Sequence, residues 1–273
     1  MKLAAIGSNC VDYYLNLNNG TGFPGGGPVN MAVYTIRLGG EASYTGPVGK
    51  DRFGEFMKKC MTSKGIDVSH VYELPGKTAI SEVELKDNER VFGAYDEGVL
   101  SEYKISPEEL EFIASHDVVV CDLWGKVQGC FQALKDKNVK TAFDCATNPD
   151  SPVSVSVMPF TDYLFFSSDL GDTEALREKM REIKACGPEM VIAMLGEKGS
   201  LCFDGQEFIS CGIVKADPLV DTMGAGDSYI AGFLYGITEG KTIKEAMQLG
   251  AENATETLMY FGAWEYDINE NEE

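Results

Sequence analysis

Short apolar runs recur along this 273-residue chain, and stretches with helical periodicity lie between them. Within each run the apolar residues are consecutive and do not alternate with polar ones, which is typical of strands buried on both faces of a sheet. Helices between such strands make the sheet parallel. The sequence therefore predicts an α/β fold with a mostly parallel central sheet flanked by helices. The runs are LAAI from residue 3, DVVVC from 117, KTAFD from 140, DYLFF from 162 and MVIAML from 190.

Three apolar stripes with helical spacing are bounded by residues that begin or end helices. The stripe after Pro28 ends at a pair of glycines, and the stripe after Asp51 ends at Gly65. The third begins in DTMGAGDSYIAGF, residues 221–233, where apolar residues fall at i, i+3, i+4 and i+7. This pattern places Asp227 in the first turn of a buried helix.

Residues 78–99 depart from the alternation of buried strands and helices. Their sequence, TAISEVELKDNERVFGAYDEGV, contains two strand-like segments and no following helix. The polar residues 86–89 between them predict a turn. We expect an antiparallel flap that projects from the main sheet. Without any repeat or linker, the chain is expected to form one domain over residues 1–273. Its β lid is formed mainly by 78–99, and part of 11–24 can also contribute.

Composition narrows the class of protein. The net charge of -20 disfavours binding to nucleic acid or to anionic membranes. Eight cysteines without a CxxC pair indicate reduced thiols, and two isolated histidines argue against a histidine metal site or a Ser-His-Asp triad. The N-terminus does not resemble a signal peptide, and no apolar run is long enough to span a membrane. We therefore expect a cytoplasmic enzyme.

The small residues before Asp227 suggest a chemical role. The first N–H groups of a helix are unpaired and the helix dipole favours negative charge there, so Gly224, Ala225 and Gly226 would let a phosphate approach closely. A carboxylate in the same turn would repel that phosphate unless it accepts a proton from the attacking group, as in phosphoryl transfer. The alternative is that Asp227 only caps its helix, although a cap does not require small residues before it.

Two further glycine-rich stretches have open interpretations. In GFPGGGPVNMA, residues 22–32, the glycines allow close approach to a ligand and Asn30 offers a donor and an acceptor. The alternative is a turn in which Asn30 bonds to backbone. In MLGEKGSLCFDG, residues 194–205, two glycines would let the loop pass a nucleotide with Lys198 near its phosphates. An ordinary hairpin explains those glycines equally well.

With these residues placed, the chain resembles the ribokinase-like (PfkB-type) carbohydrate kinases. DTMGAGDSYIAGF matches the DTxGAGD signature of that family, and the match extends from Ile6 to Trp264. GGGPVNMAVYTIRLGG, GPVGKDRFGEFM, GIDVSHV and LGEKGS support it in the family's order and spacing. The resemblance implies a ribokinase-like fold, a β lid that closes over a sugar, and ATP with Mg2+ as cofactors. A monomer or homodimer is expected.

The resemblance also implies roles for single residues. Asp227 corresponds to the base that deprotonates the sugar hydroxyl, and the N–H groups of Gly224, Ala225 and Gly226 correspond to an anion hole for the γ-phosphate. The other implied contacts are Asp12, Gly26 and Asn30 for the sugar, Gly196, Lys198 and Gly199 for the nucleotide, and Asp221 with the carbonyl of Met223 for a monovalent cation such as K+.

One family motif is incomplete. An NxxE motif often shapes the magnesium site in this family, whereas the corresponding stretch here is FFSSDLGD, residues 165–172. Asp169 can substitute for the acid, but the asparagine is missing. The sequence therefore leaves the magnesium ligands unassigned.

Within the family, four stretches resemble bacterial kinases that phosphorylate fructoselysine at position 6. They are IGSNCVDYY, VELKDNERVFGAYDEGV, DTMGAGDSYIAGFLYG and YFGAW. Arg90 is then a candidate contact to the substrate, and Glu82, Asp96 or Glu97 could pair with its lysine ammonium. The alternative for these acids is a solvated edge strand. Fructose, 2-keto-3-deoxygluconate or a nucleoside are alternative substrates, and a non-catalytic sugar or nucleotide sensor is the alternative from another class.

Overall fold

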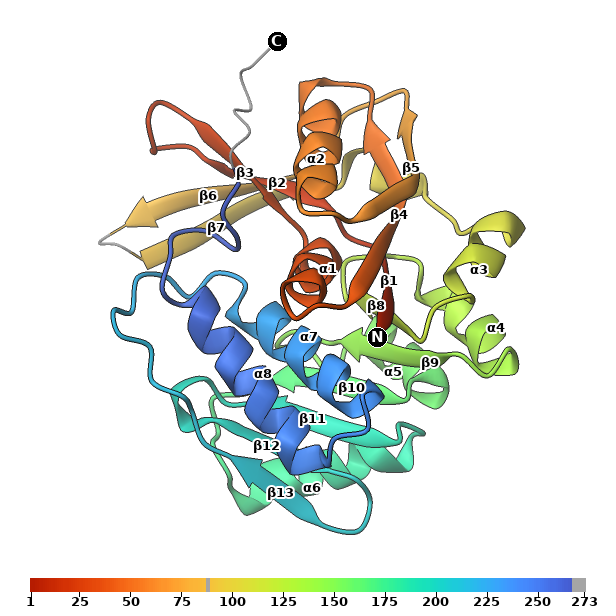
Figure 1. The fold of residues 1–273 in the computed structure, drawn as a ribbon, viewed down its shortest axis with the longest axis vertical. Coiled ribbons are helices and arrows are strands. Elements are labelled where there is room, and N and C mark those ends of the chain that lie inside the picture. The colour runs from red at the N-terminus through yellow and green to blue at the C-terminus, as the bar shows by residue number, and fades with distance from the viewer. Residues whose placement is uncertain (87–88, 267–273) are drawn as a thin grey trace.

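The structure is a computed structural model that describes residues 1–86 and 89–266. Its main element is a nine-stranded sheet, drawn in Figure 1. The strands are β1 (Lys2–Ile6), β4 (Glu41–Gly49), β5 (Asp67–Leu74), β8 (Val118–Asp122), β9 (Lys140–Asp144), β10 (Tyr163–Ser167), β11 (Met190–Met194), β12 (Ser200–Phe203) and β13 (Phe208–Cys211). Their order across the sheet is β13-β12-β11-β10-β9-β8-β1-β4-β5. Strands β12 and β13 pair antiparallel and the others pair parallel, so the predicted mostly parallel sheet is confirmed.

Helices cover both faces of this sheet. They are α1 (Gly27–Arg37), α2 (Arg52–Ser63), α3 (Pro107–Ile113), α4 (Phe131–Asp136), α5 (Pro152–Val157), α6 (Glu174–Ala185), α7 (Ala225–Thr238) and α8 (Ile243–Thr257). Short 3-10 helices are η1 (Gly98–Glu102), η2 (Gln128–Cys130), η3 (Met158–Phe160) and η4 (Gly196–Lys198). The helices predicted after Pro28 and Asp51 and around Asp227 are α1, α2 and α7.

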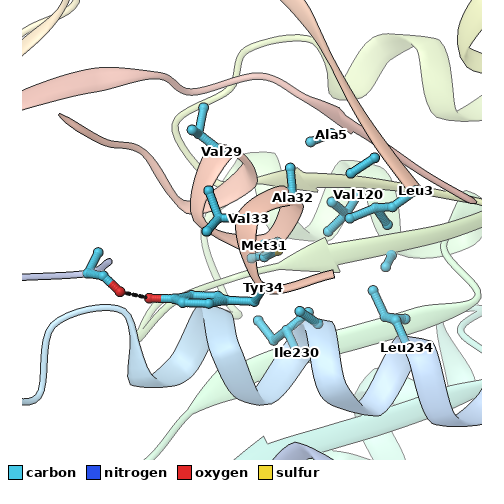
Figure 2. Close-up of a cluster of buried hydrophobic side chains, with 14 of the residues drawn as sticks. Leu3, Ala5, Val29, Met31, Ala32, Val33, Tyr34, Val120, Ile230 and Leu234 are labelled. Atoms are coloured by element: carbon cyan, nitrogen blue, oxygen red, sulfur yellow. Dashed lines mark hydrogen bonds between the residues drawn. The ribbon is translucent and has the colours of Figure 1, made fainter. Parts of the chain in front are cut away.

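Two hydrophobic cores explain why the strand sequences do not alternate. Leu3 and Ala5 of β1 pack into the core that contains side chains of α1, α2, α7 and α8. Ala4 and Ile6 of the same strand pack into the core beneath α3 to α6. Figure 2 shows the first of these cores, where residues of α1 lie between the sheet and Ile230 of α7. The middle residues of the inner strands are therefore buried, whichever face their side chains occupy.

A second, four-stranded sheet projects from one side of the body (Figure 1). Its order is β3-β2-β6-β7, with β2 (Cys10–Tyr14), β3 (Thr21–Gly25), β6 (Ile80–Lys86) and β7 (Glu89–Asp96). Strands β6 and β7 are antiparallel, as predicted for the flap, and β6 also pairs parallel with β2. Asp87 and Asn88, at the centre of the predicted turn, lie outside the described residues. We call this four-stranded sheet the lid.

Two further expectations concern the cysteines, which were predicted to be reduced, and the apolar runs, which were predicted to be too short to span a membrane. All eight cysteines are free in the structure, and most are buried, whereas Cys186 is exposed. No helix within residues 1–86 and 89–266 is long and apolar enough to cross a membrane.

Helices α7 and α8 touch backbone to backbone, and this contact fixes the helix that carries Asp227. A Cβ atom added at Gly232 of α7 would lie 2.7 Å from the Cα atom of Gly250 in α8. Arg37 of α1 strengthens the contact, because its guanidinium donates to Ser228 Oγ at 2.8 Å and to the carbonyl of Asn253 at 2.7 Å. The glycine within α7 therefore serves close helix packing.

Replacing Gly232 with Ala should separate α7 from α8. Alanine is favoured over glycine in a helix by about 1 kcal/mol, whereas overpacking costs about 1–3 kcal/mol. We expect a net fall in the free energy of unfolding, measured by urea denaturation with circular dichroism. Gly212→Ala is the matched control, because a Cβ atom there meets no heavy atom of residues 1–86 and 89–266 within 4 Å. Equal stability of the two variants would contradict the backbone contact.

Candidate functional site

The amino terminus of α7 forms the centre of the candidate site. The residue before the helix is Gly224, in the left-handed conformation with φ of 74°. A Cβ atom there would lie 2.2 Å from the hydroxyl oxygen of Tyr34, so this position requires glycine. No side chain in the described part of the chain caps this helix. Asp227 therefore does not act as the helix cap that the sequence left open as an alternative.

The carboxylate of Asp227 is held by a chain of two hydrogen bonds. Asn30 Nδ2 donates to Asp227 Oδ2 at 2.8 Å, and Trp264 Nε1 donates to Asn30 Oδ1 at 2.8 Å. Because the indole N–H must face the amide oxygen, the amide NH2 is turned toward Asp227. Asn30 and Trp264 are buried, and Asn30 bonds to side chains, whereas the turn interpretation would have it bond to backbone. Trp264 was not predicted as a site residue, because no local sequence pattern indicates that an indole will contact a residue 234 positions away.

Two more carboxylates lie beside Asp227. Asp122 and Asp144 end the neighbouring strands β8 and β9 and are paired in register. Asp122 Oδ2 accepts a hydrogen bond from Ser8 Oγ. Asp122 Oδ2 and Asp227 Oδ1 each lie 3.3 Å from the position of a Cβ atom on Gly27, so they flank the same glycine. Neither aspartate was predicted from the sequence as a site residue, although VVVCD and KTAFD each end a buried strand in aspartate, and ligands bind at the carboxyl ends of parallel strands.

Burial shifts the titration of this carboxylate cluster. Burial raises the pKa of Asp122 to about 6 and the pKa values of Asp12 and Asp144 to about 7. Burial also raises the pKa of Asp227 well above its usual range, and the nearby charges of Asp144, Asp122 and Asp12 add to this shift. The hydrogen bond from Asn30 acts in the opposite direction, because it stabilises the ionised carboxylate.

The donor set near Asp122 suits a divalent cation. Among residues 1–86 and 89–266, no group of three or more His, Cys, Asp or Glu side chains could hold a metal by itself. Mg2+ is usually held by one or two carboxylates together with phosphates and water. Asp122 Oδ1 is buried without a hydrogen-bond partner in the described part of the chain, and Asp144 lies next to it in register. These two carboxylates can offer oxygen ligands to a metal–nucleotide complex.

The loop predicted to meet a nucleotide follows β11. Gly199 has φ of 87°, and a Cβ atom there would lie 2.1 Å from the carbonyl oxygen of Cys211. A Cβ atom at Gly196 would meet nothing within 4 Å among the described residues. Lys198 Nζ donates to the carbonyl oxygen of Asp169 at 2.9 Å, and Asp169 is itself exposed. Strands β11 and β12 on either side are antiparallel, so the hairpin interpretation also describes this segment.

Asp221 and Arg90 are brought together by the fold. The guanidinium of Arg90 donates through both terminal nitrogens to the two carboxylate oxygens of Asp221. The same oxygens accept the N–H groups of Met223 at 3.0 Å and Gly262 at 2.7 Å. Burial alone would raise the pKa of Asp221, but these hydrogen bonds, led by Arg90, lower it. Asp221 therefore pairs with an arginine at the place where the family resemblance implies a monovalent cation.

The predicted sugar contacts lie where the lid meets α1. Asp12 is buried on β2, and a Cβ atom at Gly25 would come within 2.4 Å of its Oδ2. Gly26 precedes α1 with φ of 100° and packs against Ser8 and Asn9.

The three lid acids have different surroundings. Glu97 pairs with Lys126, and Asp96 Oδ1 accepts the N–H of Gly98 at 3.0 Å. Glu82 is paired with Tyr13, one residue along from Asp12, so Glu82 lies on the opposite face of the lid from Asp12.

Comparisons with known proteins agree with this geometry. The model of the pfkB family carbohydrate kinases matches residues 2–268. The chain is 43% identical over 264 residues to the fructoselysine 6-kinase of Shigella flexneri, covering 96% of this chain and 99% of that protein. It is 32% identical to a fructosamine kinase of Bacillus subtilis, covering 97% and 94%. The ribokinase of Arabidopsis thaliana, solved with ribose and ATP, superposes with a TM-score of 0.85 at 22% identity, covering 96% and 93%.

Replacing Asn30 with Ala should raise the pKa of Asp227 further, because the variant loses the hydrogen bond that favours the ionised carboxylate. NMR titration of the side-chain carboxyl carbons measures this shift directly. Asn148→Ala, a change at an exposed asparagine, is the control and should leave the titration of Asp227 unchanged. An unchanged or lowered pKa in Asn30→Ala would show that Asn30 does not stabilise the charge.

Proposed function

The chain belongs to the pfkB family of carbohydrate kinases, and on that premise we propose that it transfers the γ-phosphate of ATP to the hydroxyl at position 6 of fructoselysine. As a family member the protein is an ATP-dependent sugar kinase, a phosphotransferase with an alcohol group as acceptor. The substrate is proposed from relatives that span nearly the whole chain, two of which are named fructoselysine 6-kinases, at 43% and 42% identity.

The observation that carries the proposed mechanism is the place of Asp227 in the first turn of α7. We assign it as the general base that accepts the proton of the sugar hydroxyl. The hydroxyl oxygen then attacks the γ-phosphorus, the bond from that phosphorus to the β,γ-bridging oxygen breaks, and ADP leaves. The hydrogen bond from Asn30 supports this role, because it orients the carboxylate and favours its ionised form.

The start of α7 is proposed to stabilise the charge that develops on the transferred phosphoryl group. The N–H groups of Gly224, Ala225 and Gly226 lie at the positive end of the helix dipole. Among the described residues, the N–H of Ala225 makes only a long contact of 3.3 Å to the carbonyl of Thr222, so little protein bonding competes with a phosphate.

The remaining proposed contacts surround this centre. Kinases of this family use ATP with a divalent metal, and we propose Mg2+ near Asp122 and Asp144. When bound, Mg2+ would neutralise phosphate charge and help orient the γ-phosphate. Closure of the lid would exclude water, so that the sugar hydroxyl is the acceptor. The sugar contacts proposed are Asp12, Gly26 and Asn30, and the nucleotide contacts are Gly196, Lys198 and Gly199.

Replacing Asp227 with Asn should lower kcat by about 100-fold to 10,000-fold, the usual contribution of a general base. ATP binding, measured by isothermal titration calorimetry, should be largely retained because the helix N–H groups remain. Asp136→Asn, on an exposed position of α4, is the matched control and should keep full activity. A kcat near that of the unmodified protein in Asp227→Asn would refute the assignment.

The substrate is tested by coupled ADP release on a panel of acceptors. We expect the highest kcat/KM on fructoselysine, above that on fructose, psicoselysine, 2-keto-3-deoxygluconate and nucleosides. A higher value on another acceptor would overturn the substrate but keep the kinase. Tight sugar binding without turnover on any acceptor would instead support the sensor alternative.

A further inference from the structure

Arg90 lies in the lid but directs its guanidinium at the main body. Its two terminal nitrogens donate to Asp221, and its Nε donates to the hydroxyl of Tyr14. The guanidinium carbon lies 5.1 Å from the ring centroid of Phe261 and 5.6 Å from that of Tyr14. The side chains of Arg90 and Asp221 are only 12% and 2% exposed, so this is a buried, bidentate pair and differs from a screened surface contact.

Asp221 in turn organises the backbone that leads into α7. Its carboxylate accepts the N–H of Met223, one residue before Gly224, and the N–H of Gly262. Its own N–H and that of Val220 donate to the carbonyl of Leu258, at 3.3 and 2.8 Å. Asp221 therefore ties the segment 220–224 to the segment 258–262, directly beside the proposed anion hole.

The surroundings of Asp221 do not suit a monovalent cation. Each of its two oxygens already accepts one guanidinium N–H and one backbone N–H. A cation at these oxygens would have to displace donors that point at the lone pairs, and it would be repelled by the adjacent guanidinium. The positive charge beside the start of α7 is therefore already present in the chain.

Resting on the proposed function, we propose that Arg90 is a positioning residue that holds segment 221–226 in its phosphate-binding conformation from the lid, and that its guanidinium replaces a monovalent cation at Asp221. Two consequences follow. Turnover does not require K+, and the anion hole is fully ordered only when the lid lies over the body. Because three of the five guanidinium N–H groups are engaged by Tyr14 and Asp221, the main role of Arg90 is to hold this loop, and any contact with the sugar uses the remaining two.

The cation test uses the unmodified protein. Its kcat is measured by coupled ADP release, with Mg2+ present, in potassium chloride and in tetramethylammonium chloride at equal ionic strength. We expect the same kcat in both salts. A kcat that appears only with K+ would overturn the assignment of Arg90 while leaving the kinase intact. Absence of turnover on every acceptor in both salts would overturn the proposed function and this inference with it.

The positioning role is tested with Arg90→Met, which keeps an unbranched side chain as far as the position of Nε and removes the charged end of the guanidinium. We expect kcat to fall by about 100-fold, the cost of misplacing a catalytic group by about 1 Å, while KM for ATP stays close to the original value. Arg90→Lys keeps a point charge but loses the bidentate geometry of the guanidinium. Its kcat should therefore lie between that of Arg90→Met and that of the unmodified protein. Arg181→Met, on the exposed surface of α6, is the matched control and should leave kcat unchanged.

Circular dichroism and the melting temperature establish the folded fraction of each variant, and kcat is expressed per folded molecule. A role in folding alone would lower the melting temperature of Arg90→Met without lowering this kcat, and would contradict the proposal. Partial recovery of the Arg90→Met activity by added guanidinium chloride at millimolar concentration would support it. An unchanged kcat in folded Arg90→Met, measured in tetramethylammonium chloride, would overturn it.

Discussion

A parallel sheet has to be covered on both faces, because each strand is linked to the next by a crossover that packs against the sheet. In this protein α1, α2, α7 and α8 cover one face and α3 to α6 cover the other. The inner strands thus have no face that meets water. Their charged residues are confined to the strand ends, and the aspartates of β8 and β9 are paired at the carboxyl edge of the sheet. The close contact of α7 with α8 then fixes the helix whose first turn lies beside those strand ends.

The resulting site contains a cluster of aspartate carboxylates. Asp12, Asp122 and Asp144 lie close enough to Asp227 for their charges to raise its pKa, and burial raises the pKa of all four. The protein offsets part of this cost with the hydroxyl of Ser8 on Asp122 and the amide of Asn30 on Asp227. A nucleotide triphosphate would add more negative charge. The amino terminus of α7, together with the divalent metal that we propose near Asp122, would provide the positive potential that such a ligand needs.

The lid depends on two segments that are distant in sequence. Residues 78–99 supply β6 and β7, but β6 completes its sheet by pairing with β2, which follows the first strand of the main sheet. This pairing places Asp12, Tyr14 and Arg90 on one face of the lid, because side chains alternate along a strand and neighbouring strands keep register. The same arrangement brings the guanidinium of Arg90 over the ring of Phe261 and onto Asp221.

The sequence by itself determined the α/β class, the mostly parallel sheet, the helices beginning near Pro28, Asp51 and Asp227, and the antiparallel flap. These features follow from periodicity and from local preferences of proline, glycine and capping residues, which act over a few positions. DTMGAGD also determined that a carboxylate follows small residues at a helix start, because that pattern is local.

Only the tertiary structure decided which side chains meet there. Asn30 and Trp264 are separated by 234 positions and Arg90 and Asp221 by 131, and no periodicity relates them. Their contacts depend on strand register and on the angle at which α1, α7 and the lid pack. The aspartates that end β8 and β9 are an intermediate case. Each can be recognised from the sequence of its own strand, but their proximity follows from the order of the strands in the sheet. That order is set by the crossover connections and not by local sequence.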